Sequence, residues 1–223
     1  MDRNQTQLFE FYELLALILP GSVLLFGLSK LFPNLMLFSL DKDFSAGAFG
    51  VFIIISYAVG HLVQVLGGGI EFFWRKIRGN PTAWIDAGKR QLIFDNQTTE
   101  LEERLAKKLG IPREAFHLHE LTRRQWLNAI KQMQIAIEVS GYTGRLEKFQ
   151  AIYMMCRGLI AALIILAISS AFVVTWDYWF VPYTLLAFSG ILLYRMNKFE
   201  RASIRELVIQ FLQLPIDKNT EKH

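Results

Sequence analysis

The chain has 223 residues, of which 52% are hydrophobic and only 20% are charged, and its formal net charge is +4. The hydrophobic residues are concentrated in four blocks, which is typical of a membrane protein and excludes an ordinary soluble domain. In a membrane protein a small positive balance is expected from cytoplasmic Lys and Arg, so it does not predict nucleic-acid binding by this chain. The single cysteine, Cys156, excludes an intrachain disulfide and a zinc site made of cysteines.

The first block, residues 8–32, is predicted to be an uncleaved transmembrane helix, because no signal-peptide cleavage pattern accompanies it. Pro20 and Gly21 stand in its middle. Proline removes a backbone hydrogen bond and glycine loosens the next turn, so we predict a helix break or kink at this point. An ordinary kinked span is one interpretation, and a broken helix whose freed carbonyls line a path is the other.

The second block, residues 46–70, is predicted to be a span with one sustained polar face. No formal charge lies between Asp43 and Glu71. Small and polar side chains recur there at spacings of three and four: Ser56, Tyr57, Gly60, His61 and Gln64. A membrane helix turns such a stripe toward protein or toward a wet cavity, so we expect it to serve assembly or gating. Interhelical hydrogen bonding and a pore, proton or ligand site both fit the pattern.

Residues 75–152 are predicted to be a cytoplasmic helical segment. It is the only sizeable soluble stretch, and between Arg75 and Lys148 it holds fourteen Lys and Arg against nine Asp and Glu. A helix is expected to start near Thr99 and to end at Gly110, and an amphipathic helix is expected over residues 121–139. The segment is too small for a large independent core, so we expect it to pack on its neighbours or on a copy of itself.

Two more spans are predicted at residues 154–176 and 178–195, as a hairpin within residues 153–198. Residues 199–223 are then predicted to be an amphipathic cytoplasmic helix and a polar tail. Its apolar face could pack on the chain's own cytoplasmic segment or serve a partner or self-association: Leu207, Val208, Phe211 and Leu212. Basic residues near the ends of the spans are predicted to contact lipid headgroups: Arg75, Lys76, Arg78, Arg157 and Arg195.

The predicted fold is therefore an all-α integral membrane protein. It has four transmembrane helices, with an N-terminal hairpin within residues 1–74 and a helical cytoplasmic insert between the second and third spans. Four spans place both termini on one side, and the basic segment lies on that side as well. The positive-inside rule makes this side the cytoplasm.

Little in the sequence predicts catalysis. Arg113 and His119 have the spacing of the arginine and histidine in HEPN-type ribonucleases, although Glu114 stands where those enzymes carry a small polar residue or histidine. His117 and His119 lack a third ligand for a metal. No phosphate-binding loop and no nucleophile–base pair is visible. We expect no enzyme activity, no cofactor and no metal, and a membrane-tethered nuclease is the least favoured alternative.

Three stretches carry a resemblance: Phe11-Tyr12-Glu13-Leu14-Leu15 leading to Leu19-Pro20-Gly21, then Ser56-Tyr57-Ala58-Val59-Gly60-His61, and Gly144-Arg145-Leu146-Glu147-Lys148-Phe149 before the third block. In this layout the chain resembles the small multi-pass membrane proteins of prokaryotic antiviral defence systems, such as the four-span membrane subunits of the Kiwa system and CRISPR-linked membrane accessory proteins. The resemblance implies a homo-oligomer in the inner membrane that contacts lipid, docks a cytoplasmic protein partner and senses or answers phage infection. The alternative function is a small channel, transporter or membrane-perturbing pore.

Overall fold

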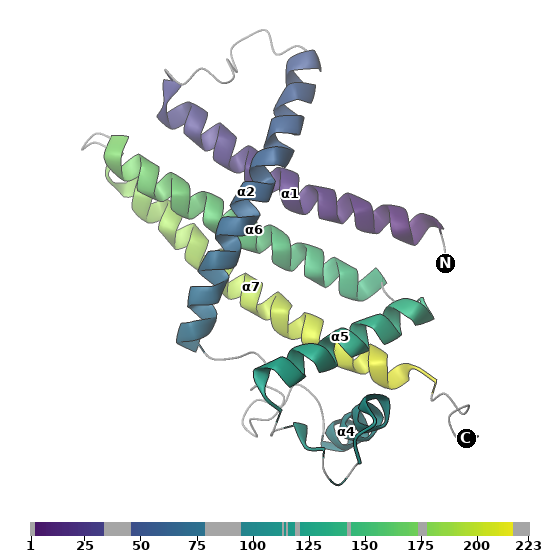
Figure 1. The fold of residues 1–223 in the computed structure, drawn as a ribbon. Coiled ribbons are helices and arrows are strands. Elements are labelled where there is room, and N and C mark those ends of the chain that lie inside the picture. The colour runs from purple at the N-terminus through teal and green to yellow at the C-terminus, as the bar shows by residue number, and fades with distance from the viewer. Residues whose placement is uncertain are drawn as a thin grey trace. The chain divides into compact units, whose positions relative to one another are not determined.

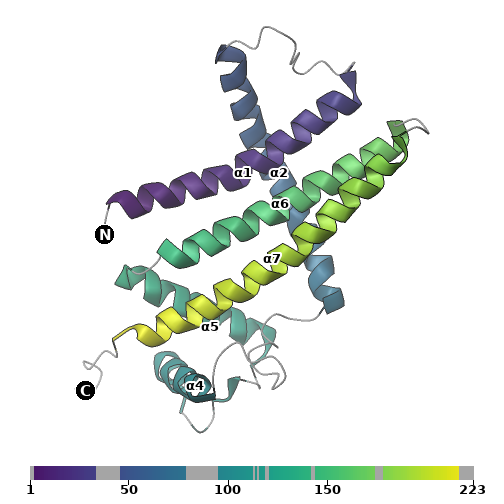
Figure 2. The ribbon, with the colours of Figure 1, turned by 180° about the vertical axis from the view of Figure 1, so that it is seen from behind.

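The computed structural model describes residues 3–33, 46–78, 95–112, 114, 116–118, 121–141, 144–173 and 178–215 (Figures 1 and 2). The regular secondary structure of these residues is helical throughout, so the predicted all-α class is confirmed for this part of the chain. The helices described are α1 (Arg3–Leu31), α2 (Ala46–Arg78), α4 (Asp95–Leu109), α5 (Arg123–Ser140), α6 (Gly144–Val173) and α7 (Phe180–Gln213).

The chain divides into two compact units, and α6 and α7 each contribute to both. The apolar unit comprises residues 2–78 and 148–200. The insert unit comprises residues 79–147 and 201–223, together with Met1. The insert unit thus combines residues of the predicted cytoplasmic segment with the C-terminal part of α7.

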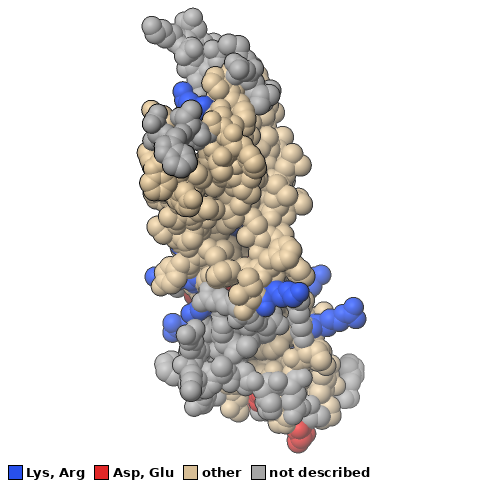
Figure 3. All heavy atoms as spheres, turned by 90° about the vertical axis from the view of Figure 1, so that its left-hand side faces the viewer, with Lys and Arg blue, Asp and Glu red and all other residues tan. Residues whose placement is uncertain are grey.

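Within the described residues, three helices are long and apolar enough to cross a membrane, over Phe11–Leu31, Ala46–Ile77 and Leu146–Val173. Helix α2 has 33 residues, and at 1.5 Å per residue this corresponds to a length of about 50 Å. The hydrocarbon core of a bilayer is about 30 Å thick, so α2 is longer than a helix needs to be to cross it. Figure 3 shows one face of the molecule on which a broad area carries almost no charged side chains.

The number of such helices differs from the predicted four. The fourth predicted span, residues 178–195, falls on α7, which is not among the three helices that meet the length and hydropathy of a span. Polar residues explain the difference. Pro182, Tyr183 and Thr184 occupy the first turns of α7, and Arg195 and Asn197 follow its most apolar stretch. The structure therefore gives a helix at the predicted place but a weaker transmembrane signal.

In the apolar unit α1, α6 and α7 run side by side in that order, and α2 crosses them on one side (Figures 1 and 2). One buried cluster joins α1, α2 and α6, with Leu24, Val63 and Leu166 among its members. A second cluster joins α6 to α7 through Ile160 and Met196. Helix α6 therefore shares apolar packing with all three of the other helices.

Helices α1 and α2 cross at glycines. A Cβ atom on Gly21 would overlap the backbone carbonyl of Ser56, and one on Gly60 would overlap that of Leu17. Helix α1 continues through Pro20 and Gly21 as one helix, which does not match the broken-helix interpretation, and a kink at this point stays a prediction. Gly21 and Gly60 permit close contact between the two helix backbones, as small residues do where membrane helices pack tightly.

The insert unit has a core of its own. Most of its buried side chains come from α4, α5 and the end of α7, with Leu105, Met133 and Val208 among those fully enclosed. Phe116 and Leu118, between α4 and α5, and Leu146 of α6 complete it. Arg104 of α4 donates from Nη1 to the carbonyl of Leu214 at 2.8 Å. Because the last carbonyls of a helix lack intrahelical partners, this bond covers the C-terminal end of α7.

Candidate functional site

The polar stripe of α2 divides between two sides of the helix. Ser56, Gly60 and Gln64 follow one another at intervals of four and are buried against neighbouring helices. Tyr57 and His61 lie one position further along and are exposed. Their rings contact each other edge to face, with centroids 4.7 Å apart. The stripe therefore provides both an internal contact and an outward-facing polar pair.

Gln64 joins three helices through one side chain. Its Nε2 donates to the carbonyl of Ala16 on α1 at 3.1 Å and to that of Met154 on α6 at 2.8 Å. Its Oε1 accepts from Nε of Arg157 at 3.1 Å. A buried amide in an apolar environment is costly unless it is bonded, and here both ends of the amide are bonded.

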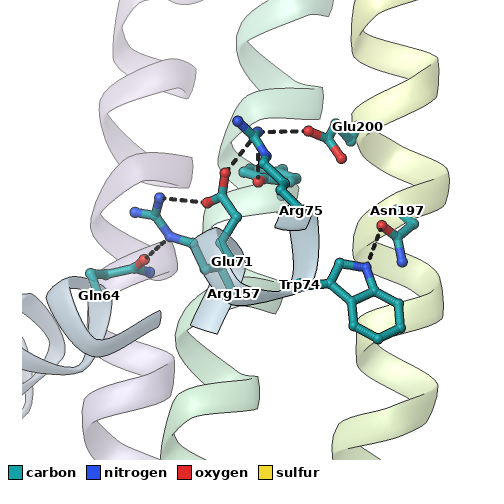
Figure 4. A network of polar contacts seen from close by, with 8 residues as sticks. Gln64, Glu71, Trp74, Arg75, Arg157, Asn197 and Glu200 are labelled. Atoms are coloured by element: carbon teal, nitrogen blue, oxygen red, sulfur yellow. Dashed lines mark hydrogen bonds and ion pairs between the residues drawn. The ribbon is translucent and has the colours of Figure 1, made fainter. Parts of the chain in front are cut away.

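Four charged side chains continue from Gln64 toward the end of α2, and we name this set the charge ladder: Arg157, Glu71, Arg75 and Glu200 (Figure 4). Arg157 Nη1 lies 3.1 Å from Glu71 Oε2. Arg75 Nη2 lies 2.7 Å from Glu71 Oε1 and 2.6 Å from Glu200 Oε1. Two arginines and two glutamates alternate, so the formal charge of the ladder is zero.

The charge ladder connects α2 to α6 and α7 through ion pairs, and a hydrogen bond is a second polar contact between α2 and α7. Trp74 donates from Nε1 to Oδ1 of Asn197 at 3.1 Å, and Asn197 donates from Nδ2 to the carbonyl of Leu193 at 2.8 Å (Figure 4). Tyr153 of α6 lies with its hydroxyl 3.4 Å from Arg75 Nη2. Donors and acceptors of three helices therefore meet at one level of the apolar unit.

Burial decides how strongly the ladder acts. The side chains of Glu71 and Glu200 are 13% and 11% exposed, and those of Arg157 and Arg75 are 25% and 31% exposed. Exposed ion pairs contribute little, whereas removal of one partner from a buried pair leaves a costly unpaired charge. The carboxylates are nearly enclosed and the guanidinium groups are partly so. The arrangement can therefore hold four charges in an apolar bundle.

The positions predicted to contact lipid headgroups have different surroundings. Arg75 and Arg157 are paired within the ladder rather than directed only to solvent or lipid. Lys76 is exposed, and Arg195 is exposed with its guanidinium 5.5 Å from the centre of the Phe199 ring. The side chain of Arg78 lies outside the described residues.

The predicted partner-binding face of the C-terminal helix is buried in the chain itself. Leu207, Val208 and Phe211 belong to the core of the insert unit, and Leu212 packs against it partly buried. Packing on the chain's own segment is thus the interpretation that matches their burial. It leaves these four side chains covered rather than available to a partner.

The candidate nuclease and metal residues are only partly visible. Arg113 and His119 lie outside the described residues, while His117 is half-buried. Among the residues that the structure describes, no group of three or more His, Cys, Asp or Glu side chains is placed to hold a metal ion.

The sequence interpretation missed Glu71, Glu200 and Asn197 as partners. One signal was available, because Glu71 and Arg75 are four residues apart on one helix and such pairs are neighbours. Comparisons with protein-family models, with curated proteins and with solved structures find no match to this chain.

Proposed function

We propose that this chain is a multi-pass membrane protein that acts by assembly rather than by catalysis. In this proposal copies associate through the outward face of α2, and the insert unit docks a cytoplasmic protein partner. The single observation that carries the proposal is the exposed pair of Tyr57 and His61, midway along a helix that can span a membrane from Ala46 to Ile77.

The position of this pair is the first supporting argument. Polar and ionisable side chains within membrane spans almost always face protein or water, because lipid gives them no hydrogen-bond partner. Within the chain His61 is exposed at mid-span. A second protein surface would cover it. Tyrosine and histidine can each donate and accept, so two copies of the same pair can bond each other across a symmetric contact.

The shape of the same face is the second argument. Gly50 and Gly68 flank the pair, and a Cβ added to either would meet no atom within 4 Å. Gly50 and Tyr57 are seven residues apart, as are His61 and Gly68, so the four residues follow one line along the helix. Small residues on such a line allow a second helix backbone to approach closely.

The proposed topology has four spans with both termini in the cytoplasm. Helix α7 supports it because residues 180–200 pack beside α6, which is itself apolar and long enough to span. If α6 spans the membrane, then a helix that packs along α6 lies in the same bilayer. The outward side chains of α7 are large and apolar, with Leu186, Phe188 and Ile191 among them. A reporter placed after Lys42 should be external and one at the C-terminus cytoplasmic, and opposite sides for the C-terminus and the insert unit would refute four spans.

The biological setting that we propose is the response to phage infection at the prokaryotic inner membrane, as the resemblance of the layout implies. Perturbation of the membrane or of the docked partner would shift α2, and the assembly would pass this change on. Phage should form fewer plaques on cells that carry the unaltered protein than on cells that carry His61→Ala. If the variant no longer assembles but both strains give the same number of plaques, then assembly has no role in defence.

Disulfide cross-linking tests self-association directly. In a Cys156→Ser background, Gly68→Cys places a thiol on the proposed contact line, and oxidation of membranes should give a covalent dimer. Leu66→Cys is the matched control, because Leu66 is also exposed but is turned roughly 140° from His61 about the helix axis. Equal dimer yield from both positions would indicate random collision and refute the proposed face.

A further inference from the structure

An apolar groove lies between α2, α6 and α7 within the apolar unit. Its volume is about 260 Å³, and its walls include Phe73 and Ile77 of α2, Ile160 and Ile164 of α6, and Gly190 and Leu193 of α7. We name it the lateral groove. It is half-open to the surroundings, and its rim is prominent, because Phe73 is 67% exposed and Ile77 is 80% exposed.

The polar atoms of the groove wall already have partners. Ser189 donates its hydroxyl to the carbonyl of Leu186 at 2.7 Å, and Trp74, which also lines the groove, donates its indole N–H to Asn197. The groove therefore offers its occupant apolar contact without hydrogen bonds. Pockets for drug-sized ligands have volumes of about 300–1,000 Å³. This groove is smaller than that, so a slender hydrocarbon chain suits it better than a cofactor.

The surroundings of the groove point to the source of such a chain. Two of its three walls belong to helices that can span a membrane, and its open side faces away from the protein. Acyl chains of the bilayer would be the apolar molecules present there at the highest concentration. At 100° per residue, Phe73 and Ile77 are turned roughly 120–160° from His61 about the axis of α2. The groove is thus separate from the proposed contact between copies.

Charge indicates which lipid would occupy it. Lys76 directly precedes Ile77, Lys198 follows Leu193 by five residues, and both lysines are exposed. The carboxylates of Glu71 and Glu200 are paired with arginines of the charge ladder. Basic side chains at the end of an apolar groove complement a phosphate at the end of an acyl chain.

We propose that the lateral groove binds one acyl chain of an anionic glycerophospholipid, with Lys76 and Lys198 beside its phosphate. The proposal is independent of self-association. It requires only that the apolar unit lies in a bilayer.

Photochemical labelling of the full chain tests it. The protein is reconstituted into phosphatidylcholine vesicles that contain phosphatidylglycerol with a photoactivatable diazirine on one acyl chain, and labelled peptides are mapped by mass spectrometry. Label should concentrate at residues 70–77, 160–164 and 189–193. Gly190→Leu should reduce it there several-fold, because a Cβ at Gly190 meets no protein atom within 4 Å and a larger side chain would fill the groove.

Gly69→Leu is the matched control, since Gly69 also has open space around it but does not line the groove. This control should leave the labelling unchanged. Leu193→Phe is a second filling variant, and it keeps the test decisive if Gly190→Leu fails to fold. Labelling spread evenly over exposed residues, or labelling unchanged by both filling variants, would show bulk lipid only and overturn the site.

The contact of Lys76 and Lys198 with the lipid phosphate can be tested separately. Lys76→Gln with Lys198→Gln should reduce labelling by the phosphatidylglycerol probe several-fold and leave labelling by the same diazirine on phosphatidylcholine unchanged. Equal labelling of the groove by both probes in the unaltered protein would overturn the choice of an anionic lipid.

Discussion

Glu71 is the branch point of the charge ladder, because it accepts from both Arg75 at 2.7 Å and Arg157 at 3.1 Å. We predict that Glu71→Gln destabilises the apolar unit by about 2 kcal/mol. Removal of one partner from a fully buried pair costs about 3–5 kcal/mol, and an exposed pair is worth about 0–1 kcal/mol. The guanidinium groups are 25–31% exposed, so the expected loss lies between these limits.

The measurement is unfolding of the purified full chain in mild detergent by added sodium dodecyl sulfate, followed by far-ultraviolet circular dichroism. Lys76→Gln is the control, because Lys76 is exposed on the same helix. Surface changes of this kind alter stability by no more than about 0.5 kcal/mol. If Glu71→Gln is no more destabilising than the control, then the ladder does not hold the helices together.

A double-mutant cycle separates the ladder from two independent side chains. Glu71→Gln together with Arg157→Gln restores a neutral set and leaves Arg75 paired with Glu200 at 2.6 Å. We expect the double variant to lose less than the sum of the two single variants, by about 1 kcal/mol or more. Losses that add within about 0.5 kcal/mol would refute the reasoning, because residues that share no interaction show additive effects.

Four other variants test the packing. Gly60→Leu should prevent α1 from packing on α2, since its side chain would meet the backbone of α1, and size-exclusion chromatography in mild detergent should show an aggregated protein. Gln64→Leu should cost about 1 kcal/mol in the unfolding assay, because its bonds to two helix carbonyls are lost. Met133→Ala should cost about 2–4 kcal/mol, because its side chain is fully buried. Gly141→Ala should cost about 1 kcal/mol, because its φ is +80°. A stability equal to that of the unaltered chain would contradict the corresponding contact.

The helices of the insert unit could be predicted because their faces follow local periodicity. Trp126, Met133 and Ile137 recur at helical spacing, and the structure buries all three. Thr122 accepts from the backbone of Gln125 and completes a capping box at the start of α5. Such features depend on neighbours within one or two turns, which is why sequence alone can reveal them.

The ladder depends on residues far apart in the chain. Arg75 and Glu200 are separated by 125 positions, and nothing in either local sequence indicates that α2 and α7 meet there. A basic residue after an apolar block usually contacts headgroups, so that interpretation was the natural one for Arg75. The sequence also did not indicate which polar residues of α2 are buried and which are exposed, because this too depends on contacts between distant residues. Which polar residues turn inward depends on where α1 and α6 lie.

Helix α2 carries both the internal ladder and the outward pair that we propose as a contact between copies. Hydrogen bonds weaken beyond about 3.2 Å, and the ladder contacts measure 2.6–3.1 Å. A shift of α2 would therefore act on two of these contacts, Arg157 with Glu71 on the α6 side and Arg75 with Glu200 on the α7 side. Because an unpaired buried charge is costly, the ladder opposes separation of these helices. In the function that we propose, a displacement of α2 imposed by another copy or by the membrane would be passed to α6 and α7 through the ladder.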